Sequence, residues 1–94
     1  MKPQITEISI TPIQPRGGLI GFASFIFNSA LYIADVGVHT RPDNNAALRL
    51  VYPVKKFPNG KQIPILRPIN IETGRAIEEA VAEEWHRLIG GGHA

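Results

Sequence analysis

The stretch that decides the fold is LRLVYPVKKFPNGKQIPILRPIN, residues 48–70. Its first part, Leu48 to Val54, is aliphatic and β-branched, which predicts a strand. Phe57-Pro58-Asn59-Gly60 follows with turn chemistry, because proline presets a negative φ while asparagine and glycine tolerate a positive one. Lys61 to Arg67 is then expected to return as a second strand. The segment therefore predicts a hairpin that leads directly into the only evident helix.

The return strand and the tip of this hairpin differ in the type of side chain that they carry. The return strand is expected to place Ile63 and Ile65 on one face, since successive side chains of a strand alternate. The tip is basic, because Lys55, Lys56 and Lys61 follow one another with no acidic residue between them. The basic tip is the clearest functional signal in the sequence.

Three more strands are predicted upstream. Ile5 to Thr11 alternates apolar and polar residues, as a half-buried strand does, and the prolines and glycines of residues 12–18 form a turn after it. Leu19 to Phe27 has apolar residues at both odd and even positions, so both faces of the strand are apolar. This is typical of a central strand with both faces covered, or of a strand in an interface. Leu31 to Val38 is the returning strand, and residues 41–45 are expected to be a loop. The face of this returning strand that we expect in the core consists of Tyr32, Ala34, Val36 and Val38.

The last part of the chain is predicted to form one amphipathic helix. Asn70 is a suitable N-cap for a helix that starts near Ile71, and Thr73 is a second candidate. The glycines at 90–92 end the helix. The apolar stripe recurs at spacings of four, four and three, and consists of Ile77, Val81, Trp85 and Leu88.

The predicted fold class is α+β: an antiparallel sheet of four to five strands with one C-terminal amphipathic helix packed on it. Residues 1–89 are expected to form a single domain, and residues 90–94 a flexible glycine-rich tail. A domain of 94 residues buries a modest share of its surface, so help from a second subunit is expected.

Charge is unevenly distributed along the chain. Residues 1–70 carry eight basic and three acidic side chains, a net charge of +5, and residues 71–94 carry two basic and five acidic ones, a net charge of −3. The sheet half is therefore basic and the helix acidic, so an anionic partner would meet the sheet and its loops. The alternative is that these charges only solvate two surfaces.

Several classes of protein are excluded or disfavoured. The chain contains no cysteine, which excludes disulfides and thiolate metal sites. No apolar run is long enough to span a bilayer, and the N-terminus lacks the apolar core of a signal peptide. We therefore expect a soluble, cytoplasmic protein without a membrane partner.

No catalytic or metal-binding set is evident, so we expect neither an enzyme nor a cofactor or small-molecule substrate. Asp35 and His39 are too far apart along one predicted strand to form a direct pair. The three histidines, His39, His86 and His93, share no ligand spacing. The glycines at 17–21 lack the Lys-Ser/Thr ending of a phosphate-binding loop.

Nucleic-acid binding is better supported. The candidate contacts are Lys55, Lys56, Lys61, Arg67 and Arg75. The lysines can neutralise phosphates, and Arg75 lies near helix N–H groups that also attract phosphate. Asn70 is placed to offer a polar edge for base contact. Phe57 and Tyr52 could stack on bases or pack in the core, and Trp85 is expected to be core.

The chain resembles the SpoVG family (stage V sporulation protein G, a septation regulator). The likeness rests on residues 52–60 (YPVKKFPNG), residues 65–70 (ILRPIN) and the helix end Trp85-His86-Arg87-Leu88. The earlier strands match more loosely, through Ala23-Ser24 and Asp35-Val36. The resemblance therefore covers nearly the whole chain.

The resemblance implies a small bacterial regulator that forms homodimers, binds DNA and in some cases RNA, and influences sporulation, septation or virulence gene expression. The family's basic hairpin corresponds to Lys55, Lys56 and Lys61, and its helix start, which tunes sequence preference, to Ile71–Ala76. The sequence departs from the family pattern at Arg67, where histidine is usual, and at Lys61, where an acid is common. Further departures are Phe57, Pro64 and Gly74-Arg75.

A second interpretation remains open. The apolar strand Leu19–Phe27, or an unpaired sheet edge, could recruit a division or replication protein by strand addition. In that case the chain is a protein-interaction module that regulates cell division without nucleic acid.

Overall fold

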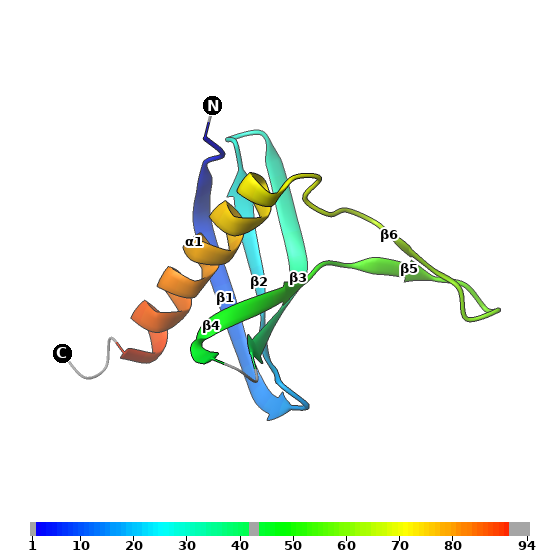
Figure 1. Cartoon of the computed structure of the whole chain (residues 1–94), viewed down its shortest axis with the longest axis horizontal. Helices are drawn as coiled ribbons and strands as arrows, with labels where there is room; N and C mark the ends of the chain where they lie inside the picture. Colours follow the sequence, from blue (N-terminus) through cyan, green and yellow to red (C-terminus); the bar gives the residue numbers. More distant parts are fainter. Residues whose placement is uncertain (1, 42–43, 91–94) are drawn as a thin grey trace.

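The computed structural model describes residues 2–41 and 44–90 and shows a four-stranded sheet, a two-stranded hairpin and one helix (Figure 1). The main sheet is antiparallel, with strand order β1-β2-β3-β4. Its strands are β1 (Ile5–Arg16), β2 (Leu19–Phe27), β3 (Leu31–Arg41) and β4 (Asn44–Val51). The hairpin consists of β5 (Val54–Lys56) and β6 (Gln62–Pro64), and helix α1 spans Ile71–Gly90. The predicted α+β architecture is confirmed.

Helix α1 lies across one face of the main sheet and contacts both edge strands, β1 and β4. Ile77 and Val81 are buried, and Trp85 packs against the core beside them. Leu88 was expected on the same stripe but is exposed, since the end of the helix runs out past β1 (Figure 1). The largest fully buried side chains of the sheet are Phe25, Val36 and Val38.

The predicted hairpin is divided between two sheets. Residues 48–51 do not pair with the return strand; they belong to β4, which pairs with β3 from Gly37↔Val51 to Arg41↔Asn44. The chain leaves the main sheet at Pro53, and only residues 54–56 pair with residues 62–64. Proline lacks the N–H that would continue the β4 ladder, which accounts for the break. Asn44 and Asn45 are strand rather than loop, while Pro42, Asp43 and residues 91–94 of the expected tail lie outside the described residues.

A bulge in β3 divides the face that we expected to be buried: Val36 and Val38 are buried as predicted, whereas the residues before the bulge follow the opposite alternation. Ala23 pairs with Val36 and Phe25 with Ile33, so two steps on β2 face three steps on β3. Asp35, the residue within this bulge, has a φ of 61°. The alternation therefore shifts, and Ile33 joins the buried residues, while Tyr32 and Ala34 do not.

The first strand continues through both prolines that were expected to end it. β1 reaches Arg16, and Pro12 is paired with Gly21 of β2. Prolines are tolerated here because β1 is an edge strand. At this pair the two backbones approach closely: a Cβ on Gly21 would lie 2.8 Å from the carbonyl oxygen of Thr11.

The second face of the main sheet is not covered by the helix. Phe22, on this face, is 40% exposed, whereas Ala23 and Phe25 are buried on the other. β2 thus has apolar residues on both faces, as the sequence predicted. Because β1 and β3 flank it, β2 has no free edge for strand addition.

The hydroxyl group of Tyr52 is a polar group that the surrounding core gives no hydrogen-bond partner. Its side chain packs against the core, and its hydroxyl is buried without a hydrogen-bond partner among the described residues. Burial, with a smaller contribution from the negative charge of Glu78, raises the pKa of Tyr52 from 10.0 to about 12. Tyr52 is therefore a packing residue, the second of the two roles considered for it.

We predict that Tyr52→Phe stabilises the fold by about 1 kcal/mol at pH 7, because it removes a buried hydroxyl without a partner. Urea unfolding followed by circular dichroism measures this difference. The unfolded wild type loses the tyrosine proton near pH 10 and the folded form only near pH 12, so stability falls with pH between these values. The advantage of the variant should widen between pH 9 and pH 11.5, and a pH-independent difference would contradict the assignment.

Candidate nucleic-acid interface

The basic tip lies on a hairpin that we call the arm, residues 54–64. The turn at its end closes through two backbone hydrogen bonds: Phe57 N–H donates to the Lys61 carbonyl (2.8 Å), and Gly60 N–H donates to the Phe57 carbonyl (2.9 Å). The Asn59 side-chain oxygen accepts a third, from Lys61 N–H (3.0 Å). Gly60 has a φ of 87°, a conformation that glycine adopts without strain. The predicted turn is confirmed.

The arm projects from the body of the molecule, away from both the main sheet and α1 (Figure 1). Lys55 and Lys56 lie on β5, Lys61 immediately precedes β6, and all three side chains are exposed. The ammonium of Lys55 lies 5.6 Å from the centroid of the Phe57 ring, within range of a cation–π contact. Since residues 54–64 contain no acid, the arm presents a positive charge that its own side chains do not neutralise.

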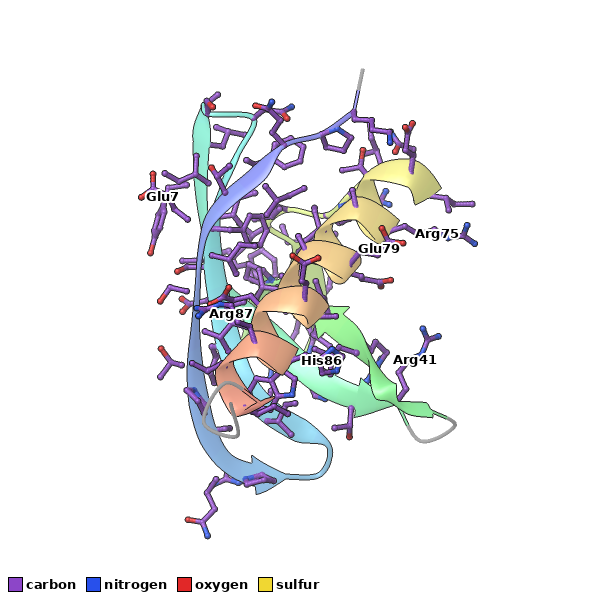
Figure 2. The ribbon with its side chains drawn as sticks, turned by 90° about the vertical axis from the view of Figure 1, so that its left-hand side faces the viewer. Glu7, Arg41, Arg75, Glu79, His86 and Arg87 are labelled. Atoms are coloured by element: carbon purple, nitrogen blue, oxygen red, sulfur yellow. The ribbon has the colours of Figure 1, made fainter. Side chains whose placement is uncertain are left out.

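The two predicted arginines are not part of the arm. Arg67 is exposed in the segment that joins the arm to α1. Arg75 is exposed on α1 and points away from the sheet, with Glu79 beyond it on the same helix (Figure 2). Lys2, Arg75 and Glu79 line one shallow hollow at the start of the helix. The structure therefore gathers the three lysines and leaves Arg75 among acidic neighbours.

Asn70 has a structural function at the start of α1. Its side-chain oxygen accepts a hydrogen bond from Thr73 N–H (2.8 Å), and its carbonyl accepts one from Gly74 N–H (3.2 Å). The first prediction for the N-cap is confirmed, and Thr73 lies inside the helix. The cap engages the side-chain oxygen, so only the Nδ2 end of this exposed amide is left for the base contact suggested for it.

Near the C-terminal end of α1, Arg87 is paired with a carboxylate of the same helix. The Arg87 guanidinium donates two hydrogen bonds to the Glu84 carboxylate, one of them 3.0 Å long. This hydrogen-bonded contact lowers the pKa of Glu84 and raises that of Arg87. The pair leaves Arg87 less available to an external anion.

The described residues contain neither a cluster of candidate metal ligands nor a membrane-spanning helix. Within residues 2–41 and 44–90, no three His, Cys, Asp or Glu side chains lie close enough to hold a metal ion. His93 lies outside these ranges. In the same part of the chain, no helix is long and apolar enough to cross a bilayer.

The arm exposes apolar residues whose exposure was not predicted from the sequence. Ile63 and Ile65 were expected on one face of a paired strand, but Ile63 is 42% and Ile65 63% exposed. The sequence signal for this exposure was that the segment between Gly60 and Pro68 is short and is interrupted by Pro64. A proline limits the hydrogen-bonded pairing of a strand.

Comparison with known proteins now identifies the family. Residues 3–87 match the SpoVG family. The chain belongs to the SpoVG family. Relatives named septation protein SpoVG, from Geobacillus thermodenitrificans, Bacillus cytotoxicus and Bacillus velezensis, are each 29% identical over 85 residues. These alignments cover 90% of this chain and 85%, 84% and 84% of the respective relatives. The resemblance predicted from the sequence is confirmed.

We predict that Asn70→Ala lowers the free energy of unfolding by about 1 kcal/mol, since an N-cap is lost. Asn70→Asp should retain the wild-type stability, because aspartate caps equally well. Thermal and urea unfolding measure both variants. The nucleic-acid affinity of the folded Asn70→Ala protein should equal that of the wild type. A loss of affinity in both variants would instead indicate that the Asn70 side chain contacts the nucleic acid directly.

Proposed function

We propose that this SpoVG-family protein is a homodimeric, non-enzymatic regulator that binds DNA, and RNA in some settings, through the arm. The observation that carries the proposal is the set of three exposed lysines, Lys55, Lys56 and Lys61, on a projecting hairpin without acidic residues. The names of the relatives support a role in septation. Such a regulator acts in the cytoplasm, where the nucleic acid is.

Phosphate contact is the chemistry that this arm supports best. Each lysine that neutralises a phosphate releases a condensed counterion, which favours binding at low salt and weakens it at high salt. These contacts position a protein on the backbone and carry no sequence information directly. Arg67, between the arm and the helix, extends the positive surface toward the body of the protein.

The acidic helix contributes to the orientation in which the protein approaches a nucleic acid. α1 carries five glutamates, Glu72, Glu78, Glu79, Glu83 and Glu84. A polyanion is repelled from that side and attracted to the arm, so the charge separation steers the encounter. This separation favours an approach with the arm foremost.

We predict that the triple variant Lys55/Lys56/Lys61→Ala loses most binding to a fluorescent random-sequence DNA duplex. Because each protomer loses three phosphate contacts, the slope of log K against log salt should become shallower by about 3 units per protomer engaged. The measurement is fluorescence anisotropy over a salt series, repeated with single-stranded DNA and with RNA.

The matched control is Lys2/Arg16/Arg49→Ala, which removes the same three charges from exposed positions outside the arm. Both triple variants change the net charge from +2 to −1, so a general electrostatic effect would weaken them equally. The proposal requires a much larger loss for the arm variant. Equal losses, or no wild-type binding at low salt, would overturn it.

A further inference from the structure

The face of the main sheet that α1 leaves uncovered carries a hollow, which we call the sheet hollow. It encloses about 190 Å³ and is lined by residues of β1, β2 and β3. Pockets for whole drug-sized molecules enclose roughly 300 to 1,000 Å³. The sheet hollow therefore suits a single ring system rather than a larger ligand.

Two exposed aromatic side chains line the sheet hollow. Phe22 lies on β2 and Tyr32 on β3, the two central strands of the sheet, and they are 40% and 71% exposed. Tyr32 pairs with Ile26, so the two aromatic residues lie four residues apart along the sheet, about 13 Å. RNA-recognition modules use exposed aromatic residues on a four-stranded sheet to stack unpaired bases. The uncovered face has the elements of such a platform.

Most of the other residues that line the sheet hollow are polar. Ser9 and Ser24 pair across β1 and β2, and their hydroxyls, with that of Thr11, can donate or accept hydrogen bonds. Asp35 adds an exposed carboxylate. Among the described residues, no hydrogen bond or ion pair engages this carboxylate. It is therefore available to a ligand.

The bulge in β3 shapes this side of the hollow. Ala34 and Asp35 are consecutive residues, which a regular strand would place on opposite faces, yet both line the sheet hollow. Asp35 has a φ of 61°, a conformation that aspartate adopts more readily than most residues. A bulge commonly re-aims a side chain in this way.

The charge around the sheet hollow restricts what can enter it. None of the residues that line it is basic. Glu7, which lies at a register shift in β1, adds a second carboxylate on the side of the sheet opposite α1 (Figure 2). A phosphate is repelled by these carboxylates, whereas an uncharged group that donates hydrogen bonds is not. The lining thus favours an uncharged ring with hydrogen-bond donors.

We propose that the sheet hollow binds one unpaired guanine of a single-stranded nucleic acid, stacked on Tyr32 and Phe22 and held by Asp35. An ionised carboxylate accepts hydrogen bonds and donates none. Guanine presents two neighbouring donors, N1–H and the 2-amino group, so the carboxylate can accept both in a bidentate contact. In a duplex these donors are paired and the base is stacked inside, so the hollow reads only an unpaired guanine.

The guanine site rests on the proposed function and adds base recognition to it. The lysines of the arm contact phosphates, which position a protein but carry no sequence information directly. The sheet hollow lies on different strands from the arm and would supply the selection between bases. The phosphates of the bound strand remain outside the hollow, away from Asp35 and Glu7.

The first test compares two fluorescent seven-nucleotide RNAs, one of uridines only and one with a guanosine at its centre. By anisotropy the wild type should bind the guanosine RNA at least about fivefold more tightly, which is the lower range for a bidentate base contact. Inosine in place of guanosine lacks the 2-amino group, so it should reduce this preference. Equal affinity for the two uridine-based RNAs would overturn the inference.

Ring removal tests the stacking contact. Tyr32→Ala should weaken binding of the guanosine RNA at least about fivefold, with an unchanged slope of log K against log salt because no phosphate contact is lost. Phe22→Ala should weaken it similarly. The matched control is Val51→Ala, since Val51 is also 40% exposed and pairs with Gly37 beside Phe22 but does not line the hollow. Equal effects of Phe22→Ala and Val51→Ala would contradict stacking.

Asp35→Asn tests the base contact without disturbing the backbone. Asparagine has the same shape and also tolerates a positive φ, so the circular dichroism spectrum and the melting temperature should match those of the wild type. The amide replaces one acceptor by a donor. The preference for the guanosine RNA should therefore disappear, while the affinity for the uridine RNA is kept. An unchanged preference would contradict the role of Asp35.

The two proposals fail separately. Lys55/Lys56/Lys61→Ala should lose affinity for both RNAs and show a shallower salt slope, yet keep its preference for guanosine. A wild type that binds duplex DNA with steep salt dependence but does not distinguish the two RNAs would refute the guanine site and leave the proposed function standing. A wild type that selects the guanosine RNA but binds no duplex would refute the function of the arm alone.

Discussion

The packing of Ile77 and Val81 against the buried face of the main sheet is the contact on which the rest of the structure depends. These two side chains join Phe25, Val36 and Val38 in the core, and α1 spans both edge strands in doing so. β4 ends opposite Gly37, partway along β3, while the helix must begin at the other end of that face. The 19 residues between Val51 and Ile71 cannot all stay in the core, and part of this connection becomes the arm.

The elements that depend on local chemistry could be predicted from the sequence. The helix stripe, its N-cap at Asn70 and the turn at residues 57–60 each follow from short-range rules of periodicity, capping and turn preference. The positions of the three lysines near a hairpin tip followed from that turn. These features were found because the residues that determine them are neighbours in the chain.

Features that depend on strand partners could not be predicted in the same way. The bulge at Asp35 is defined only by the register between β2 and β3, and it moved Tyr32 out of the expected core. The assignment of residues 48–51 to β4 depended on the available edge of β3, not on the residues themselves. Arg75 was grouped with the lysines because of its residue type, whereas in the fold it lies on α1 beside Glu79 (Figure 2).

The prolines in β1 have a consequence for how large an assembly this sheet can build. Pro12 and Pro15 lie in an edge strand and remove two amide donors from it. An edge without a continuous row of donors is a poor template for a further strand, which is how natural proteins discourage open-ended sheet growth and fibril formation. The prolines therefore keep this side of the sheet closed to lateral polymerisation.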